Sequence, residues 1–100
     1  AYHEIKLVND TQRTGYSEKN VVGAVCSSTD IMAESRRLPK MVEGDILSIE
    51  DIGAYGFSMA SHWNTRPLPP EVLVEDGETT LIREGENLDD LFHGTVLYKN

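Results

Sequence analysis

The sequence is poor in cysteine, in long apolar runs and in basic residues. Its one cysteine, Cys26, cannot form an internal disulfide, and His3, His62 and His93 lack the spacing of metal ligands around it. No apolar run approaches the roughly 20 residues of a membrane-spanning helix, and the first residues lack signal-peptide features. A formal net charge of −8 argues against nucleic acid or an anionic membrane as a partner. We therefore expect a cytoplasmic protein without a metal site.

The sequence pattern predicts a mainly β fold in a single domain, residues 1–100. Short alternating or continuous apolar stretches, separated by turn signals, are typical of an all-β sandwich or barrel. Asp76-Gly77 is a strong signal for a two-residue hairpin turn. The strands are expected over residues 3–8, 20–25, 46–50, 71–75, 78–83 and 95–98.

The expected helices are few and short. Ser28-Thr29-Asp30 is typical of a helix N-cap, which predicts one or two helical turns from Ile31 that end before Pro39. Further short helices are predicted over residues 57–61 and 87–92, the latter capped by Asn87. Residues 66–70, with three prolines, are expected to be an extended connector.

The first candidate site surrounds Cys26, which follows an apolar strand and precedes the predicted helix start. Backbone N–H groups at such a position can stabilise a thiolate. A free cysteine is also often a small buried hydrophobic side chain, and the spacing alone leaves both interpretations open.

The second candidate site is Gly53-Ala54-Tyr55-Gly56. Two glycines allow a sharp turn or a close approach of the backbone to a ligand, and a phenol there could donate to a phosphate oxygen. Tyr55 could equally be a core tyrosine with its hydroxyl at the rim. The glycine pattern is not that of a dinucleotide-binding loop.

Together these two segments resemble the diaminopimelate decarboxylases, a family of pyridoxal-phosphate enzymes. Residues 22–30 (VGAVCSSTD) resemble the family's G-P-x-C-E-S-x-D segment, and residues 53–61 (GAYGFSMAS) follow at the family's spacing. Residues 62–67 (HWNTRP) resemble its Asn-Tyr-Asn-x-Arg-Pro run. The likeness extends over nearly the whole chain, including the hairpin around residue 76.

The resemblance implies the C-terminal β-sandwich or β-barrel domain, of the alanine racemase/decarboxylase type, of a two-domain homodimeric enzyme. An N-terminal α/β barrel, absent from this sequence, would hold pyridoxal 5'-phosphate on a lysine. The four lysines here lie in segments unlike the family's cofactor-lysine motif. The 100 residues alone are therefore expected to be inactive, with the barrel domain, a second subunit and a small amino-acid substrate as partners.

The same likeness suggests roles for individual residues in converting meso-diaminopimelate to L-lysine and CO2. Cys26 would be catalytic and would project into the partner subunit's site near the substrate Cα. There it would position the departing carboxylate or return a proton to the carbon. Tyr55 would bind substrate and cofactor, near the phosphate, and Ser27 and Asp30 would bind substrate.

The sequence departs from the family pattern at the residue after the cysteine. Ser27 stands where the family usually has a glutamate that binds the far amino group of the substrate. A hydroxyl cannot pair with an ammonium as a carboxylate does. His62-Trp63 also replaces Asn-Tyr. The alternatives are therefore a decarboxylase of another basic or carrier-linked amino acid, or a stand-alone, non-catalytic β-domain used for binding or assembly.

Overall fold

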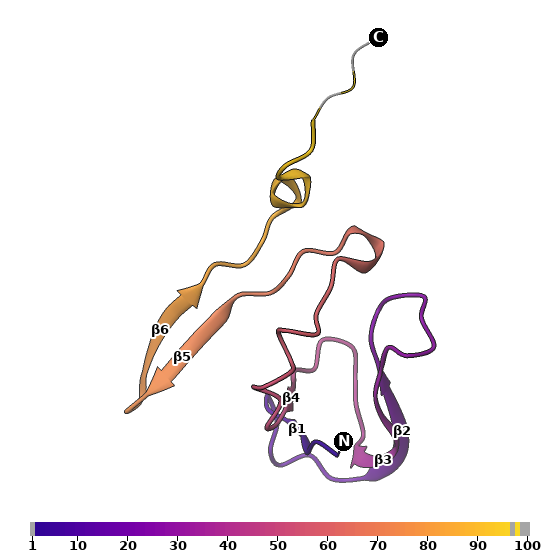
Figure 1. The fold of residues 1–100 in the computed structure, drawn as a ribbon. Coiled ribbons are helices and arrows are strands. Elements are labelled where there is room, and N and C mark those ends of the chain that lie inside the picture. The colour runs from indigo at the N-terminus through magenta and orange to yellow at the C-terminus, as the bar shows by residue number, and fades with distance from the viewer. Residues whose placement is uncertain (1, 97, 99–100) are drawn as a thin grey trace. The chain divides into compact units, whose positions relative to one another are not determined.

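The computed structural model describes residues 2–96 and 98, whose strands pair in three antiparallel ladders (Figure 1). The ladders join β1 (Ile5–Leu7) to β4 (Leu47–Ile49), β2 (Tyr16–Val22) to β3 (Ile31–Pro39), and β5 (Glu71–Glu75) to β6 (Glu78–Arg83). The only helices among these residues are the 3₁₀ helices η1 (Trp63–Thr65) and η2 (Leu88–Phe92). The predicted mainly β class with a few short helices is thus confirmed, and no helix in the described part is long and apolar enough to cross a membrane.

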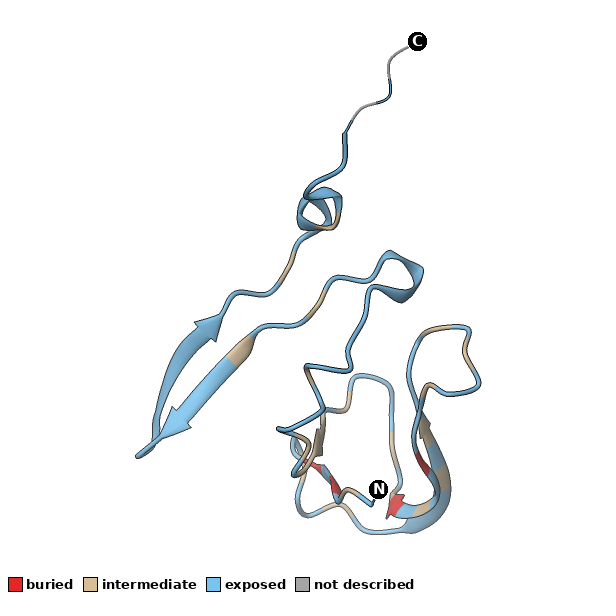
Figure 2. Ribbon diagram, in the orientation of Figure 1, coloured by how far each residue is buried: buried red, intermediate tan, exposed pale blue. Residues whose placement is uncertain are grey.

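The chain divides into two compact units, Ala1–Ala54 and Tyr55–Asn100. The buried core lies in the first unit and comes from two strands, β1 and β3 (Figure 2). Alternation along β1 places Ile5 and Leu7 inside and Lys6 outside, and β3 contributes Ala33 and Leu38. Four partly buried apolar residues pack against this core: Val21, Met41, Leu47 and Ile49.

The helix predicted from Ile31 is wrong, because residues 31–39 form strand β3. The helix-forming tendency of Ala33 and Glu34 is small compared with the cross-strand hydrogen bonds to β2 and the burial of Ala33 and Leu38. The partner strand also lies earlier than predicted, since β2 begins at Tyr16 and ends at Val22.

A bulge in β3 lies opposite Asn20. Lys19 pairs with Arg36 and Val21 with Ala33, so β3 carries one more residue than β2 over this stretch. Ser35 takes a positive φ of 48° there, and its N–H donates to the Asn20 side-chain oxygen at 2.9 Å. The side chain of Asn20 thus replaces the ladder partner that the bulge removes.

The hairpin of the second unit was predicted correctly. Asp76 and Gly77 both have positive φ, at 50° and 76°, as a two-residue turn between twisted strands requires. The final helix is also confirmed, as the 3₁₀ helix η2. Its capping box has the Asp90 N–H donating to Asn87 Oδ1 at 3.1 Å and the Asn87 N–H donating to Asp90 Oδ2 at 2.9 Å.

Two expectations for the second unit are wrong in the described residues. Residues 57–59 form turns and residues 60–61 lie in no helix, because bonds such as Met59 N–H to Tyr55 O do not continue into a helical series. Of the strand predicted at residues 95–98, Thr95, Val96 and Tyr98 lie in no strand, and Leu97 lies outside the described residues.

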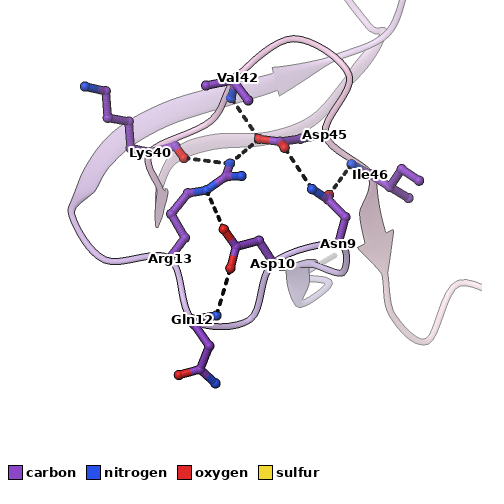
Figure 3. Close-up of polar contacts among 8 residues, drawn as sticks. All are labelled: Asn9, Asp10, Gln12, Arg13, Lys40, Val42, Asp45 and Ile46. Atoms are coloured by element: carbon purple, nitrogen blue, oxygen red, sulfur yellow. Dashed lines mark hydrogen bonds and ion pairs between the residues drawn. The ribbon is translucent and has the colours of Figure 1, made fainter.

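Arg13 ties two loops of the first unit together (Figure 3). Its guanidinium forms an ion pair with Asp45, contacts Asp10 Oδ2 at 3.3 Å and donates to the Lys40 carbonyl at 3.2 Å. The loop after β1 is thereby joined to the turn before β4.

Asp45 is the acceptor at the centre of this network, and its side chain is only 7% exposed. It accepts hydrogen bonds from the Val42 N–H at 2.8 Å and from the Asn9 amide at 3.0 Å. The hydrogen bond from Arg13, followed by those from Val42 and Asn9, lowers the pKa of Asp45 from its ordinary 3.8 to about 2.

We predict that Asp45 makes the stability of the protein acid-sensitive. A carboxylate whose pKa is lowered by folding stabilises the fold above its unfolded pKa, and this stabilisation is lost as pH falls towards about 2. Asp45→Asn should lower the free energy of unfolding at neutral pH and flatten its dependence between roughly pH 5 and pH 2, measured by urea titrations. Glu43→Gln, an exposed carboxylate of the same turn, is the control. Equal pH dependence in Asp45→Asn and the unmutated protein would contradict the prediction.

Candidate active site

Cys26 lies on the loop that connects β2 to β3, residues 23–30. Backbone bonds close this loop, because the Gly23 N–H donates to the Asp30 carbonyl at 2.9 Å and the Asp30 N–H donates to the Ser27 carbonyl at 3.2 Å. Cys26 is exposed, so it is not a core residue of this chain. No helix follows it, and the predicted stabilisation of a thiolate by a helix start is therefore wrong.

The Asp30 side chain reaches back across this loop. Its Oδ2 accepts a hydrogen bond from the Val25 N–H at 3.1 Å. Its carboxylate lies so close to Gly23 that a Cβ there would overlap it. The sequence pattern indicated that Asp30 caps a helix, whereas in the structure it closes the loop that carries Cys26.

Ser27 is engaged within the same loop. Its hydroxyl lies 2.7 Å from the Thr29 hydroxyl and accepts from the Thr29 N–H at 3.2 Å. Neither bond involves Asp30 or Gly23. The fold thus brings together three of the four predicted site residues, Cys26, Ser27 and Asp30, on one loop.

Tyr55, the fourth predicted site residue, belongs to the second unit. It lies within a run of turns over residues 53–59, in which its carbonyl accepts from the Met59 N–H at 3.0 Å. The side chain is 71% exposed, so the alternative of a core tyrosine is wrong for this chain. An exposed phenol can bind a ligand that a partner brings.

Two polar contacts of the second unit were not predicted from the sequence. Arg83 lies over the Phe57 ring, 4.5 Å from its centroid. Glu86 accepts hydrogen bonds from the Leu68 N–H at 2.7 Å and from His62 Nε2 at 2.6 Å, and these, the backbone bond first, lower the pKa of Glu86. No motif in the sequence pointed to either contact, because the partners are far apart in the chain.

Each of the two units carries an exposed group that could face a cofactor or a substrate: Tyr55 in the second unit and Cys26 in the first. An exposed phenol can donate to a phosphate oxygen, and an exposed thiol can hold or release a proton near a substrate. The described residues include no cluster of three or more His, Cys, Asp or Glu that could hold a metal ion.

The sequence of this chain is similar to one family of known proteins. A family model described as pyridoxal-dependent decarboxylase, C-terminal sheet domain, matches residues 1–53. A diaminopimelate decarboxylase of Methanothermobacter thermautotrophicus is 47% identical over 95 residues, which is 94% of this chain and 22% of that protein. The corresponding protein of Campylobacter jejuni is 43% identical over 90 residues, or 90% of this chain and 22% of that protein.

Solved structures show the same similarity. Diaminopimelate decarboxylase from M. jannaschii in co-complex with L-lysine matches with a TM-score of 0.86 and 36% identity, over 98% of this chain and 22% of that chain. The Helicobacter pylori enzyme complexed with L-lysine matches with a TM-score of 0.82 and 40% identity, over 93% of this chain and 23% of that chain. This chain therefore spans about a fifth of the length of the relatives that it matches.

We predict that the Asp30 carboxylate is the reason why residue 23 must be glycine. Gly23→Ala should destabilise the protein by about 1–3 kcal/mol, because the new methyl group displaces a hydrogen-bonded carboxylate. Gly53→Ala, where nothing lies within 4 Å of the added atom, should change stability far less. Thermal unfolding measures both.

A double-mutant cycle gives the decisive control for this contact. In an Asp30→Ala background the overlapping carboxylate is gone, so Gly23→Ala should destabilise the protein much less than it does in the unmutated protein. If Gly23→Ala is equally destabilising in that background, a neighbour other than Asp30 excludes the alanine methyl group.

Proposed function

Because this chain belongs to the pyridoxal-dependent decarboxylase family, as its C-terminal sheet domain, we propose that it completes the active site of a diaminopimelate decarboxylase. In this proposal residues 1–100 are one β-domain, and a larger N-terminal barrel holds the cofactor. The observation that carries the proposal is the exposed Cys26 on a loop closed by Asp30, in a chain 47% identical to a diaminopimelate decarboxylase.

The proposed reaction converts meso-diaminopimelate to L-lysine and CO2. Pyridoxal phosphate, when bound, accepts the electron pair of the broken carbon–carbon bond. In this proposal the thiol of Cys26 orients the carboxylate before it leaves as CO2, or it donates a proton to the carbon from which CO2 has left. L-lysine, the expected product, is the molecule named in three of the similar solved structures.

The partners that we propose are the N-terminal barrel and a second subunit of a homodimer. The hairpin of β5 and β6 supports this proposal, because apolar side chains are exposed on both of its faces. Val72, its partner Leu81 and Val74 lie on one face, and Leu73 lies on the other. An isolated two-stranded hairpin is marginally stable in water, so these faces are expected to pack against another domain. A cytoplasmic location stays an expectation, based on the lone cysteine.

Ser27 favours a second candidate for the substrate. Its neutral hydroxyl, already bonded to Thr29, cannot pair with a distant ammonium as a carboxylate would. The alternative substrate is another basic or carrier-linked amino acid. CO2 release by the full-length protein from meso-diaminopimelate, L-lysine, L-ornithine and a carrier-linked amino acid distinguishes these substrates, and release from none of them would favour a binding domain without catalysis.

We predict that Cys26→Ala in the full-length protein lowers kcat for decarboxylation by roughly 10²- to 10⁴-fold, because the group that handles the carboxylate or the proton is lost. The visible absorbance of the bound cofactor should stay close to that of the unmutated protein. Ser28→Ala, an exposed hydroxyl on the same loop, is the matched control. An unchanged kcat in Cys26→Ala would remove Cys26 from the mechanism.

We further predict that Tyr55→Phe weakens cofactor binding. Loss of one hydrogen bond to a charged phosphate should raise the Kd for pyridoxal phosphate by roughly 10- to 100-fold. Fluorescence titration of the cofactor-free protein measures this Kd. Tyr16→Phe, another exposed tyrosine, should leave it unchanged. Equal Kd values for Tyr55→Phe and the unmutated protein would rule out the phosphate contact.

A further inference from the structure

We propose that Arg83 is a positioning residue for Tyr55, which it holds through the Phe57 ring. The proposal rests on the cofactor contact of Tyr55 proposed above. It adds the contact that holds the turn carrying Tyr55 in position. All of the groups involved belong to the second unit of the chain.

Arg83 is the last residue of β6 and contacts two different partners. Its Nε forms an ion pair with Glu71 Oε1, and Glu71 is its cross-strand partner at the open end of the hairpin. The guanidinium lies 4.5 Å from the centroid of the Phe57 ring. The ion pair thus fixes the guanidinium on the hairpin, and its face remains available to the ring.

Phe57 is the residue through which the turn attaches to the hairpin. It is half-buried, whereas Tyr55, Gly56 and Met59 are exposed. The backbone of the turn is closed by Met59 N–H to Tyr55 O and by Ala60 N–H to Phe57 O, each at 3.0 Å. Because only Gly56 separates Phe57 from Tyr55, anchoring the ring restricts where the Tyr55 backbone can lie.

The combination of ring contact and ion pair favours an arginine over a lysine at position 83. A planar guanidinium can stack on a ring while its edge pairs with a carboxylate, whereas an ammonium is a compact point charge. The substitution Arg83→Lys would therefore keep the pairing with Glu71 and lose the stacking on Phe57. A hydrogen bond to phosphate depends strongly on distance and angle, so a displaced turn weakens it.

The test measures the Kd for pyridoxal phosphate in the full-length protein, by titration of its cofactor-free form. Arg83→Lys and Arg83→Gln should each raise this Kd roughly two- to five-fold, which corresponds to the loss of one exposed cation–π contact. Arg37→Lys is the matched control, because Arg37 stacks on Tyr16 at 5.3 Å in the first unit. It should leave the Kd unchanged.

A double-mutant cycle with Tyr55→Phe separates positioning from general stability. If Arg83 acts through Tyr55, Arg83→Lys should add nothing to the Kd once the phenol is gone. Independent, multiplying effects of the two substitutions would overturn the proposal.

A second measurement keeps the proposal testable if Tyr55→Phe itself leaves the Kd unchanged. That result would refute the proposed cofactor contact of Tyr55, but not the anchoring of its turn. Hydrogen exchange of the Met59 amide, which donates to the Tyr55 carbonyl, reports on the turn alone. Arg83→Lys should speed this exchange roughly two- to five-fold relative to Arg37→Lys, and equal exchange rates would refute the anchoring.

Discussion

The burial of Leu38 against Ile5 and Ala33 is the contact on which the fold of the first unit depends. Leu38 is 3% exposed, and the four buried side chains of the described residues all come from β1 and β3. Such a small core can orient two ladders but cannot fix the loops between them. Much apolar surface stays exposed, above all on both faces of the β5–β6 hairpin, and this surface is why a covering partner domain belongs to the proposed function.

Polar side chains fix the loops that the core does not reach. Asp45 accepts from three residues on two loops, Asp30 spans the loop of Cys26, and Glu86 binds the Leu68 N–H within the proline-rich connector. In each case a carboxylate satisfies backbone N–H groups that no ladder pairs. A charge-assisted hydrogen bond is about twice as strong as a neutral one, so single side chains can hold these segments.

Local signals in the sequence predicted local structure well. Asp76-Gly77 correctly predicted the hairpin, and Asn87 correctly predicted the final helix, because each of these residues acts within its own turn. The Ser28-Thr29-Asp30 signal failed because Asp30 bonds backward to Val25, and because pairing with β2 decided the conformation of the residues that follow. The resemblance to a family proposed Cys26 and Tyr55 as site residues, and these stay predictions. It said nothing of Arg83, whose contact with Phe57 joins positions 26 residues apart.

In the loop of Cys26, the contacts that close the loop do not involve the side chain of Ser27, which is the residue that departs from the family pattern. Closure depends on Gly23, on Asp30 and on main-chain atoms, including the Ser27 carbonyl. The Ser27 side chain bonds only to Thr29 among the contacts of this loop. Residue 27 can therefore change from a carboxylate to a hydroxyl without breaking the bonds that close the loop. Under the proposed function, a change of substrate contact at residue 27 would therefore leave the placement of the Cys26 backbone intact.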